Sequence, residues 1–98
     1  MDGLRIDKWL WFARFCKSRN LAQNLLEEGA VRLNGRRVDK ASCTVKPGDR
    51  VLMRLGRIWR CVEVVALGER RGPAVEAQSL YLPLPPPALT PDGELDED

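Results

Sequence analysis

The side chains best suited to chemistry in this sequence are cations gathered at two places. The first is a short break, Lys17-Ser18-Arg19, directly before a segment with a helical pattern. A helix N-terminus presents free backbone N–H groups and a partial positive charge, so it holds phosphate well, and neighbouring cations strengthen such a site. The same three residues also fit an ordinary capped helix with two solvated cations, which this motif alone does not exclude.

The second group of cations surrounds Asn34-Gly35, which lies between residues that alternate in polarity. Asn-Gly in this setting predicts a hairpin, because a type I′ turn needs positive φ at both central positions. Gly35 would also let a sugar-phosphate backbone approach closely. A solvated hairpin end is the alternative. The cations beside the turn are Arg32, Arg36, Arg37 and Lys40.

Two aromatic residues, Trp11 and Phe15, lie among Lys8, Arg14 and Lys17 on one side of the first predicted helix. Aromatic rings interleaved with cations can stack on unpaired bases of RNA. Rings this close to a small core more often pack on the protein itself. We therefore favour packing, with the segment 80–82 as the cover.

Catalytic chemistry finds little support in the sequence. It contains no histidine, which is the commonest general base and metal ligand. The three cysteines, Cys16, Cys43 and Cys61, fit no zinc-site spacing, and we expect them to be reduced and mostly buried. Asp39 and Asp49 occupy turn positions. We therefore expect no catalytic residue, no metal and no cofactor, and interpret the protein as a non-enzyme.

Charge is divided unevenly along the 98 residues. All 16 lysines and arginines lie between Arg5 and Arg71, so residues 1–75 carry a net charge of +8, whereas residues 76–98 carry −6. A basic domain attracts polyanions through a salt-dependent field. No apolar run approaches the length that spans a bilayer. We expect one small domain, cytoplasmic and monomeric, without contact to a membrane.

These side chains must be positioned by short elements. Leu4–Cys16 predicts a helix with one apolar face and with Asp7 on the opposite side. Ser18 is suited to cap a second helix that ends at Gly29. Residues 73–82 fit either one helical turn or an extended segment. The predicted strands are 31–33, 36–38, 51–55 and 58–67; Pro83, Pro85, Pro86 and Pro87 favour polyproline II, and 90–98 is predicted to be disordered.

Taken in order, these pieces resemble the S4 RNA-binding domain family. The resemblance covers residues 4 to about 55 and implies an α+β fold, with two N-terminal helices packed on a small, bent, mostly antiparallel sheet. It places an S4-like domain at 1–72, with its core motif at 4–55, before a Pro-rich and acidic tail at 73–98. The matching residues are Arg5-Ile6-Asp7-Lys8, Lys17-Ser18-Arg19, Ala22, Leu25-Leu26, Gly29, Val31, Asn34-Gly35, Val38, Ser42, Val45 and Pro47-Gly48-Asp49.

The opening, Asp7 to Arg19, and the stretch Arg70 to Ala77 resemble a ribosome-associated heat-shock subgroup of this family. That resemblance implies binding to ribosomal RNA and to a large ribosomal subunit that still carries peptidyl-tRNA, in rescue or recycling of stalled subunits. The acidic tail departs from the basic extension of longer relatives, and it should repel RNA or mask the basic surface. The residues predicted to contact RNA are Arg5, Lys8, Arg14, Lys17, Ser18, Arg19, Gln23, Arg32, Asn34, Gly35, Arg36, Arg37 and Lys46.

Two alternatives remain at this point. The chain could be the RNA-targeting subunit or fragment of an enzyme that modifies ribosomal or transfer RNA. It could also be a protein-interaction module that uses Trp11, Phe15 and the proline run.

Overall fold

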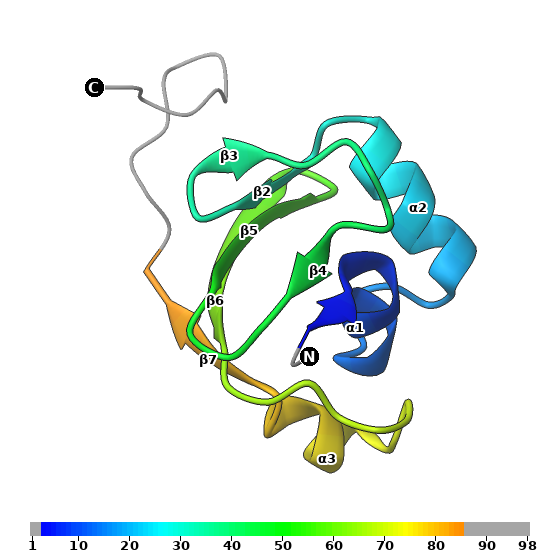
Figure 1. Cartoon of the computed structure of the whole chain (residues 1–98), viewed down its shortest axis with the longest axis vertical. Helices are drawn as coiled ribbons and strands as arrows, with labels where there is room; N and C mark the ends of the chain where they lie inside the picture. Colours follow the sequence, from blue (N-terminus) through cyan, green and yellow to red (C-terminus); the bar gives the residue numbers. More distant parts are fainter. Residues whose placement is uncertain (1–2, 86–98) are drawn as a thin grey trace.

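Ten short elements make up residues 3–85, the part of the chain that the computed structural model describes (Figure 1). The predictions for Pro86, Pro87 and 90–98 lie outside these residues. The elements are β1 (Leu4–Arg5), α1 (Ile6–Phe12), α2 (Arg19–Glu27), β2 (Val31–Leu33), β3 (Arg36–Arg37), β4 (Thr44–Val45), β5 (Arg50–Leu55), β6 (Ile58–Val64), α3 (Ala74–Gln78) and β7 (Tyr81–Leu84).

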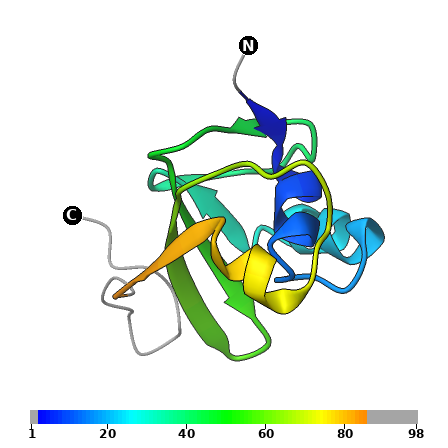
Figure 2. The same cartoon turned by 90° about the horizontal axis from the view of Figure 1, so that it is seen from below.

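A five-stranded antiparallel sheet in the order β3-β2-β5-β6-β7 supports the two helices α1 and α2 (Figures 1 and 2). Cross-strand partners lie on the same face of a sheet. Val31 pairs with Met53, and Val51 pairs with Val62, and all four are fully buried under the helices. The predicted α+β architecture of the S4 type is confirmed.

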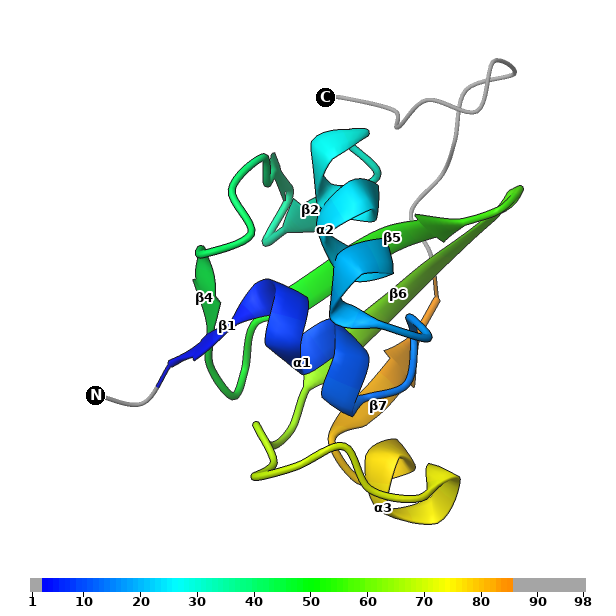
Figure 3. The ribbon, with the colours of Figure 1, turned by 90° about the vertical axis from the view of Figure 1, so that its right-hand side faces the viewer.

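The first helix is shorter at both ends than the predicted range 4–16. At its start, Leu4 and Arg5 pair with Val45 and Thr44 in a separate two-stranded sheet, visible at one side of the molecule in Figure 3. At its end, Arg14 has φ of 65°, and the N–H of Phe15 donates to the carbonyl of Leu10. This is a Schellman closure, which normally uses glycine at the left-handed position. An arginine there gave no sequence signal for the helix end.

The second helix and the hairpin follow the prediction closely. Ser18 Oγ accepts a hydrogen bond from the N–H of Leu21 at 3.1 Å, which confirms the N-cap. Gly29 follows the helix with φ of 75°, as expected of the residue after a C-cap. Asn34 and Gly35 have φ of 52° and 87°, so the predicted positive φ at both turn positions is confirmed.

The chain after residue 72 continues the sheet. Residues 74–78 form α3, and β7 pairs with β6 from Tyr81 opposite Val64 to Leu84 opposite Cys61. Polyproline II at Pro83 is therefore wrong: β7 is the edge strand, where a missing N–H is tolerated. The strand predicted over 58–67 ends at Val64. We propose that the folded domain extends at least to Leu84.

Two aromatic rings join this last strand to the helices. The centroid of Phe15 lies 4.6 Å from that of Tyr81, and Leu80 beside it is buried. Tyr81 faces the helices, whereas its neighbour Leu82 is 52% exposed. Because alternate residues of a strand point to opposite faces, these neighbours form a matched pair for testing whether β7 belongs to the fold.

We predict that Tyr81→Ser lowers the free energy of unfolding by about 1–3 kcal/mol, because it removes a packed ring from a partly buried position. Leu82→Ser, which changes the adjacent exposed side chain, should lower it by less than half as much. Urea denaturation of both variants measures the difference. Equal losses would contradict the role of β7 as a packed strand.

Candidate nucleic-acid interface

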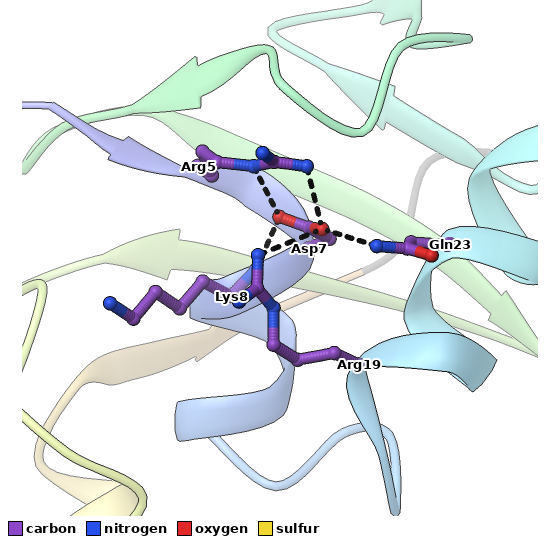
Figure 4. Close-up of polar contacts among 5 residues, drawn as sticks. All are labelled: Arg5, Asp7, Lys8, Arg19 and Gln23. Atoms are coloured by element: carbon purple, nitrogen blue, oxygen red, sulfur yellow. Dashed lines mark hydrogen bonds and ion pairs between the residues drawn. The ribbon is translucent and has the colours of Figure 1, made fainter.

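The carboxylate of Asp7 lies in the first turn of α1 and is completely shielded from solvent. Its position favours a negative charge, since the N-terminus of a helix carries a partial positive charge. Arg5 approaches it with a forked pair of bonds, Nε to Oδ1 at 3.2 Å and Nη2 to Oδ2 at 3.1 Å. The N–H of Lys8 also donates to Oδ1, at 2.8 Å. Figure 4 shows these contacts converging on one side chain.

The second helix completes the cluster. Arg19 Nη2 lies 3.3 Å from Oδ2 of Asp7, and Gln23 Nε2 donates to the same oxygen at 3.0 Å. Arg19 and Gln23 are four residues apart, so they share one face of α2. Asp7 thus binds the start of α1 to the first two turns of α2. Because an unpaired buried charge is strongly unfavourable, both arginines must stay close to this carboxylate.

Opposing influences set the charge state of Asp7. Burial would raise its pKa, but hydrogen bonds from Gln23 and Arg5 and the charges of Arg19 and Arg5 together outweigh burial. The pKa of this carboxyl therefore lies below its ordinary value. Asp7 remains ionised at neutral pH and holds two cations whose side chains are still 47% and 39% exposed, for Arg5 and Arg19 respectively.

The predicted residues of the helix corner divide into three groups. Arg5, Arg19 and Gln23 point their side chains at Asp7, whereas Lys8 donates only its backbone N–H and extends its ammonium group away, 5.5 Å from the ring centroid of Phe12 (Figure 4). Ser18 uses its hydroxyl for the helix cap, while Lys17 beside it is exposed. Arg14 is drawn away, since its Nε donates to the carbonyl of Gly72 at 2.6 Å.

The hairpin residues form a second cluster with its own internal bonds. Asn34 Nδ2 donates to Asp49 at 3.1 Å, and Asn34 Oδ1 accepts from the N–H of Arg50. The other oxygen of Asp49 accepts from the N–H of Lys46. Asn34 is therefore engaged in joining the hairpin turn to the turn at 46–49. The cationic side chains of Arg36 and Lys46 remain exposed around this junction, as does Gly35 in the turn.

Arg32 and Arg37 are cross-strand partners in β2 and β3. A Cβ placed on Gly29 would lie 2.6 Å from the guanidinium of Arg37, which shows that this cation lies against the C-terminal end of α2. Cations are favourable there because of the helix dipole. Arg37 of the hairpin therefore lies at the C-terminal end of α2, whereas Arg19 lies at the N-terminal end of the same helix.

The two aromatic residues pack on the protein, as favoured from the sequence. Trp11 is half-buried, and the guanidinium of Arg71 lies 5.8 Å from its ring centroid, while Arg71 Nε donates to the Trp11 carbonyl. Phe15 packs on Tyr81 and faces the guanidinium of Arg60 at 5.2 Å. These cations stabilise the layer between helix and sheet.

Metal binding and thiol chemistry are the other functions to consider for the described residues. Over residues 3–85, no group of histidine, cysteine, aspartate and glutamate could hold a metal ion. The cysteines are free, but only Cys16 is buried; Cys43 and Cys61 are half-buried, so the prediction of mostly buried thiols is wrong. Burial raises the pKa of the Cys16 thiol to about 11. Within the same range, no helix has the length and apolar character of a membrane span.

The sequence prediction missed Asp7 as the centre of the site. It placed this residue, from its angle around the helix, on the face opposite the apolar stripe. Asp7 lies one residue from Ile6 and three from Leu10, hence at the edge of the apolar stripe that faces α2. The available signal was that position at the stripe's edge, combined with arginine two residues earlier.

Comparison with known proteins agrees with this geometry. Residues 4–51 match the family described as S4 domain. The RQC P-site tRNA stabilizing factor of Halalkalibacterium halodurans is 37% identical over 80% of this chain and 86% of its own length. The chain belongs to the S4 domain family. This S4 domain is also similar to heat shock protein 15 of Escherichia coli, at 46% identity over 80% of the chain, and to its homologue in Haemophilus influenzae, at 41%.

The S4 domain protein spans 58–59% of the length of these two heat shock proteins. Among solved structures, the trimeric heat shock protein 15 of Vibrio cholerae superposes with a TM-score of 0.79 at 40% identity, covering 85% of this chain and 83% of the other. Because that related structure is a trimer, the expected monomer has no support.

We predict that Asp7→Asn lowers the free energy of unfolding by about 1–3 kcal/mol, since the amide leaves Arg5 and Arg19 without a charge partner. Asp39→Asn is the matched control, because Asp39 is exposed and its neutralisation should change stability by less than about 0.5 kcal/mol. Thermal denaturation at neutral pH compares the stabilities of the Asp7→Asn and Asp39→Asn variants. Similar stabilities would contradict a structural role for the buried carboxylate.

The lowered pKa of Asp7 also predicts a pH dependence. The unfolded chain takes up a proton near the ordinary value of about 3.9, before the folded chain does. The stabilisation is therefore complete above that pH and is lost as pH falls through the lower pKa of the folded state. The stability difference between wild type and Asp7→Asn should shrink when denaturation is repeated from about pH 6 to about pH 2. A constant difference would contradict this assignment.

Proposed function

We propose that this protein binds structured RNA without catalysis, through the helix corner that Asp7 organises. The observation that carries this proposal is the double engagement of Arg5 and Arg19. Each directs part of its guanidinium to the buried carboxylate and leaves part exposed. Lys8 in α1 and Lys17 before the cap of α2 add positive charge to the same part of the chain. The corner therefore offers a cationic surface whose two arginines are held in place before RNA arrives.

Such a surface suits the sugar-phosphate backbone of folded RNA. Double-helical RNA hides its base edges in a narrow major groove, so compact basic surfaces read its shape and its phosphates. Phosphate contacts position a protein on nucleic acid without reading sequence. The residues that we propose for this role are Arg5, Lys8, Lys17 and Arg19 at the corner, with Arg32, Gly35, Arg36, Arg37 and Lys46 around the hairpin. Ser18, Gln23 and Asn34 position these groups, and Arg14 supports the helix end.

We further propose a place on the large ribosomal subunit, with ribosomal RNA and peptidyl-tRNA as partners, in rescue or recycling of stalled subunits in the cytoplasm. Support comes from relatives whose names refer to heat shock and to stabilisation of P-site tRNA in Bacillus subtilis and Halalkalibacterium halodurans. The net charge of +8 over residues 1–75 favours a polyanionic partner such as ribosomal RNA.

Lys17→Glu tests the corner without disturbing Asp7, because Lys17 is exposed and makes none of the bonds to that carboxylate. We predict roughly tenfold weaker binding to a ribosomal RNA fragment at about 100 mM salt, and a salt dependence reduced by about one phosphate contact. Filter binding across a salt series measures both quantities.

Arg57→Glu is the control for Lys17→Glu. It makes the same charge reversal at the exposed turn between β5 and β6, outside the corner and the hairpin at residues 31–37. Its effect on affinity should be threefold or less, which is the share expected from net charge alone. Equal losses in the two variants would show that RNA responds only to overall charge, and the corner would then have no special role.

A further inference from the structure

The face of the sheet opposite α1 and α2 carries arginines that the proposed function leaves unused. Along β5, Val51 and Met53 face the helices, so the alternating residues Arg50, Leu52 and Arg54 face the other way. Leu52 pairs with Cys61, so Cys61 lies on the same outer face as Arg50. Burial raises the pKa of the Cys61 thiol, and the charge of Arg50 opposes that rise in part.

Cross-strand pairing extends this surface on both sides of β5. Arg32 in β2 pairs with Leu52, and Trp59 in β6 pairs with Arg54. The arginine face is therefore defined by Arg50 and Arg54 on either side of Leu52, and it is bordered by Arg32, Cys61 and Trp59. Glu63 pairs with Arg50 and offsets part of its charge. No ion pair within residues 3–85 shorter than 4.0 Å involves Arg50 or Arg54.

The chain itself contains a segment of opposite charge. Residues 92–98 carry five acidic residues and no basic one. Opposite charges brought together at low ionic strength attract each other, and linkage through the same chain raises their effective concentration. An acidic ligand for the arginine face is therefore available within the chain, without a second molecule.

The position of β7 brings the last described strand within reach of the arginine face. Leu84 pairs with Cys61, which pairs with Leu52, which pairs with Arg32, so these four residues form one row across the outer face. Two strand spacings, about 10 Å, separate Leu84 from Leu52. Asp92 follows Leu84 by eight residues, which reach about 26 Å when extended. Figure 2 shows β7 ending on the side away from α1 and α2.

We propose that the acidic segment 92–98 docks on the arginine face of its own sheet. Docking would neutralise Arg50 and Arg54 and leave the helix corner and the hairpin cations as the cationic surfaces. It also reconciles a strongly acidic segment with RNA binding, because the segment is held away from the corner. The inference goes beyond the proposed function and does not depend on it, since docking needs no RNA.

The test compares amide chemical shifts of the full chain with those of a variant in which all five acids are neutralised: Asp92→Asn, Glu94→Gln, Asp96→Asn, Glu97→Gln and Asp98→Asn. We expect shift changes at Arg32, Leu52 and Cys61, and none in α1 or α2. The changes should fall by more than half when salt is raised from about 50 mM to about 500 mM. Neutralising Glu27 and Glu28 on α2 is the control and should leave that row of the sheet unchanged.

A second arm assigns the effect to the arginines. In a chain carrying Arg50→Gln and Arg54→Gln, neutralising the acids should produce less than half of the shift change at Leu52 and Cys61. Unchanged amides on the sheet, changes centred on the α1–α2 corner, or full-size changes in the Arg50→Gln, Arg54→Gln chain would each overturn the proposal. Because no RNA is present, none of these outcomes bears on the proposed function.

Discussion

The buried carboxylate of Asp7 is the constraint on which this structure depends. A charged group without contact to water is stable only when other charges and hydrogen bonds replace its hydration. Here the replacement comes from two parts of the chain, Arg5 before the first helix and Arg19 with Gln23 on the second. The requirement to satisfy one carboxylate therefore fixes how the two helices meet.

The same requirement prepares the surface for a ligand. A flexible arginine loses conformational freedom when it binds phosphate, and that loss weakens binding. Arg5 and Arg19 have lost much of that freedom already, because each is bonded to Asp7. Among residues 3–85, the buried Nε of Arg19 has no hydrogen-bond partner. The guanidinium is instead held through its Nη2, which donates to Asp7 Oδ2. The ion pairs that stabilise the folded domain therefore also hold Arg5 and Arg19 in place for a ligand.

Local signals in the sequence predicted much of the fold, because they depend on neighbouring residues only. The cap at Ser18, the left-handed residue Gly29 and the turn at Asn34-Gly35 each follow from backbone preferences. Two features depended on distant contacts and were missed: the burial of Asp7 and the pairing of Pro83 opposite Val62. The helix end at Arg14 is local, but it was missed because arginine occupies a position where glycine is usual. Asp7 needed partners from α2, and Pro83 needed a neighbouring strand that no local pattern reveals.

The most direct test of the central claim follows the side-chain Nε–H signals of arginine during titration with a ribosomal RNA fragment. The signals of Arg5 and Arg19 should shift together and saturate at the same RNA concentration, because both arginines are held by Asp7. The signal of Arg70, which pairs with Glu76 on α3, should stay in place. Binding that moves Arg70 and leaves Arg5 and Arg19 unchanged would contradict the account, since RNA would then contact a surface that Asp7 does not organise.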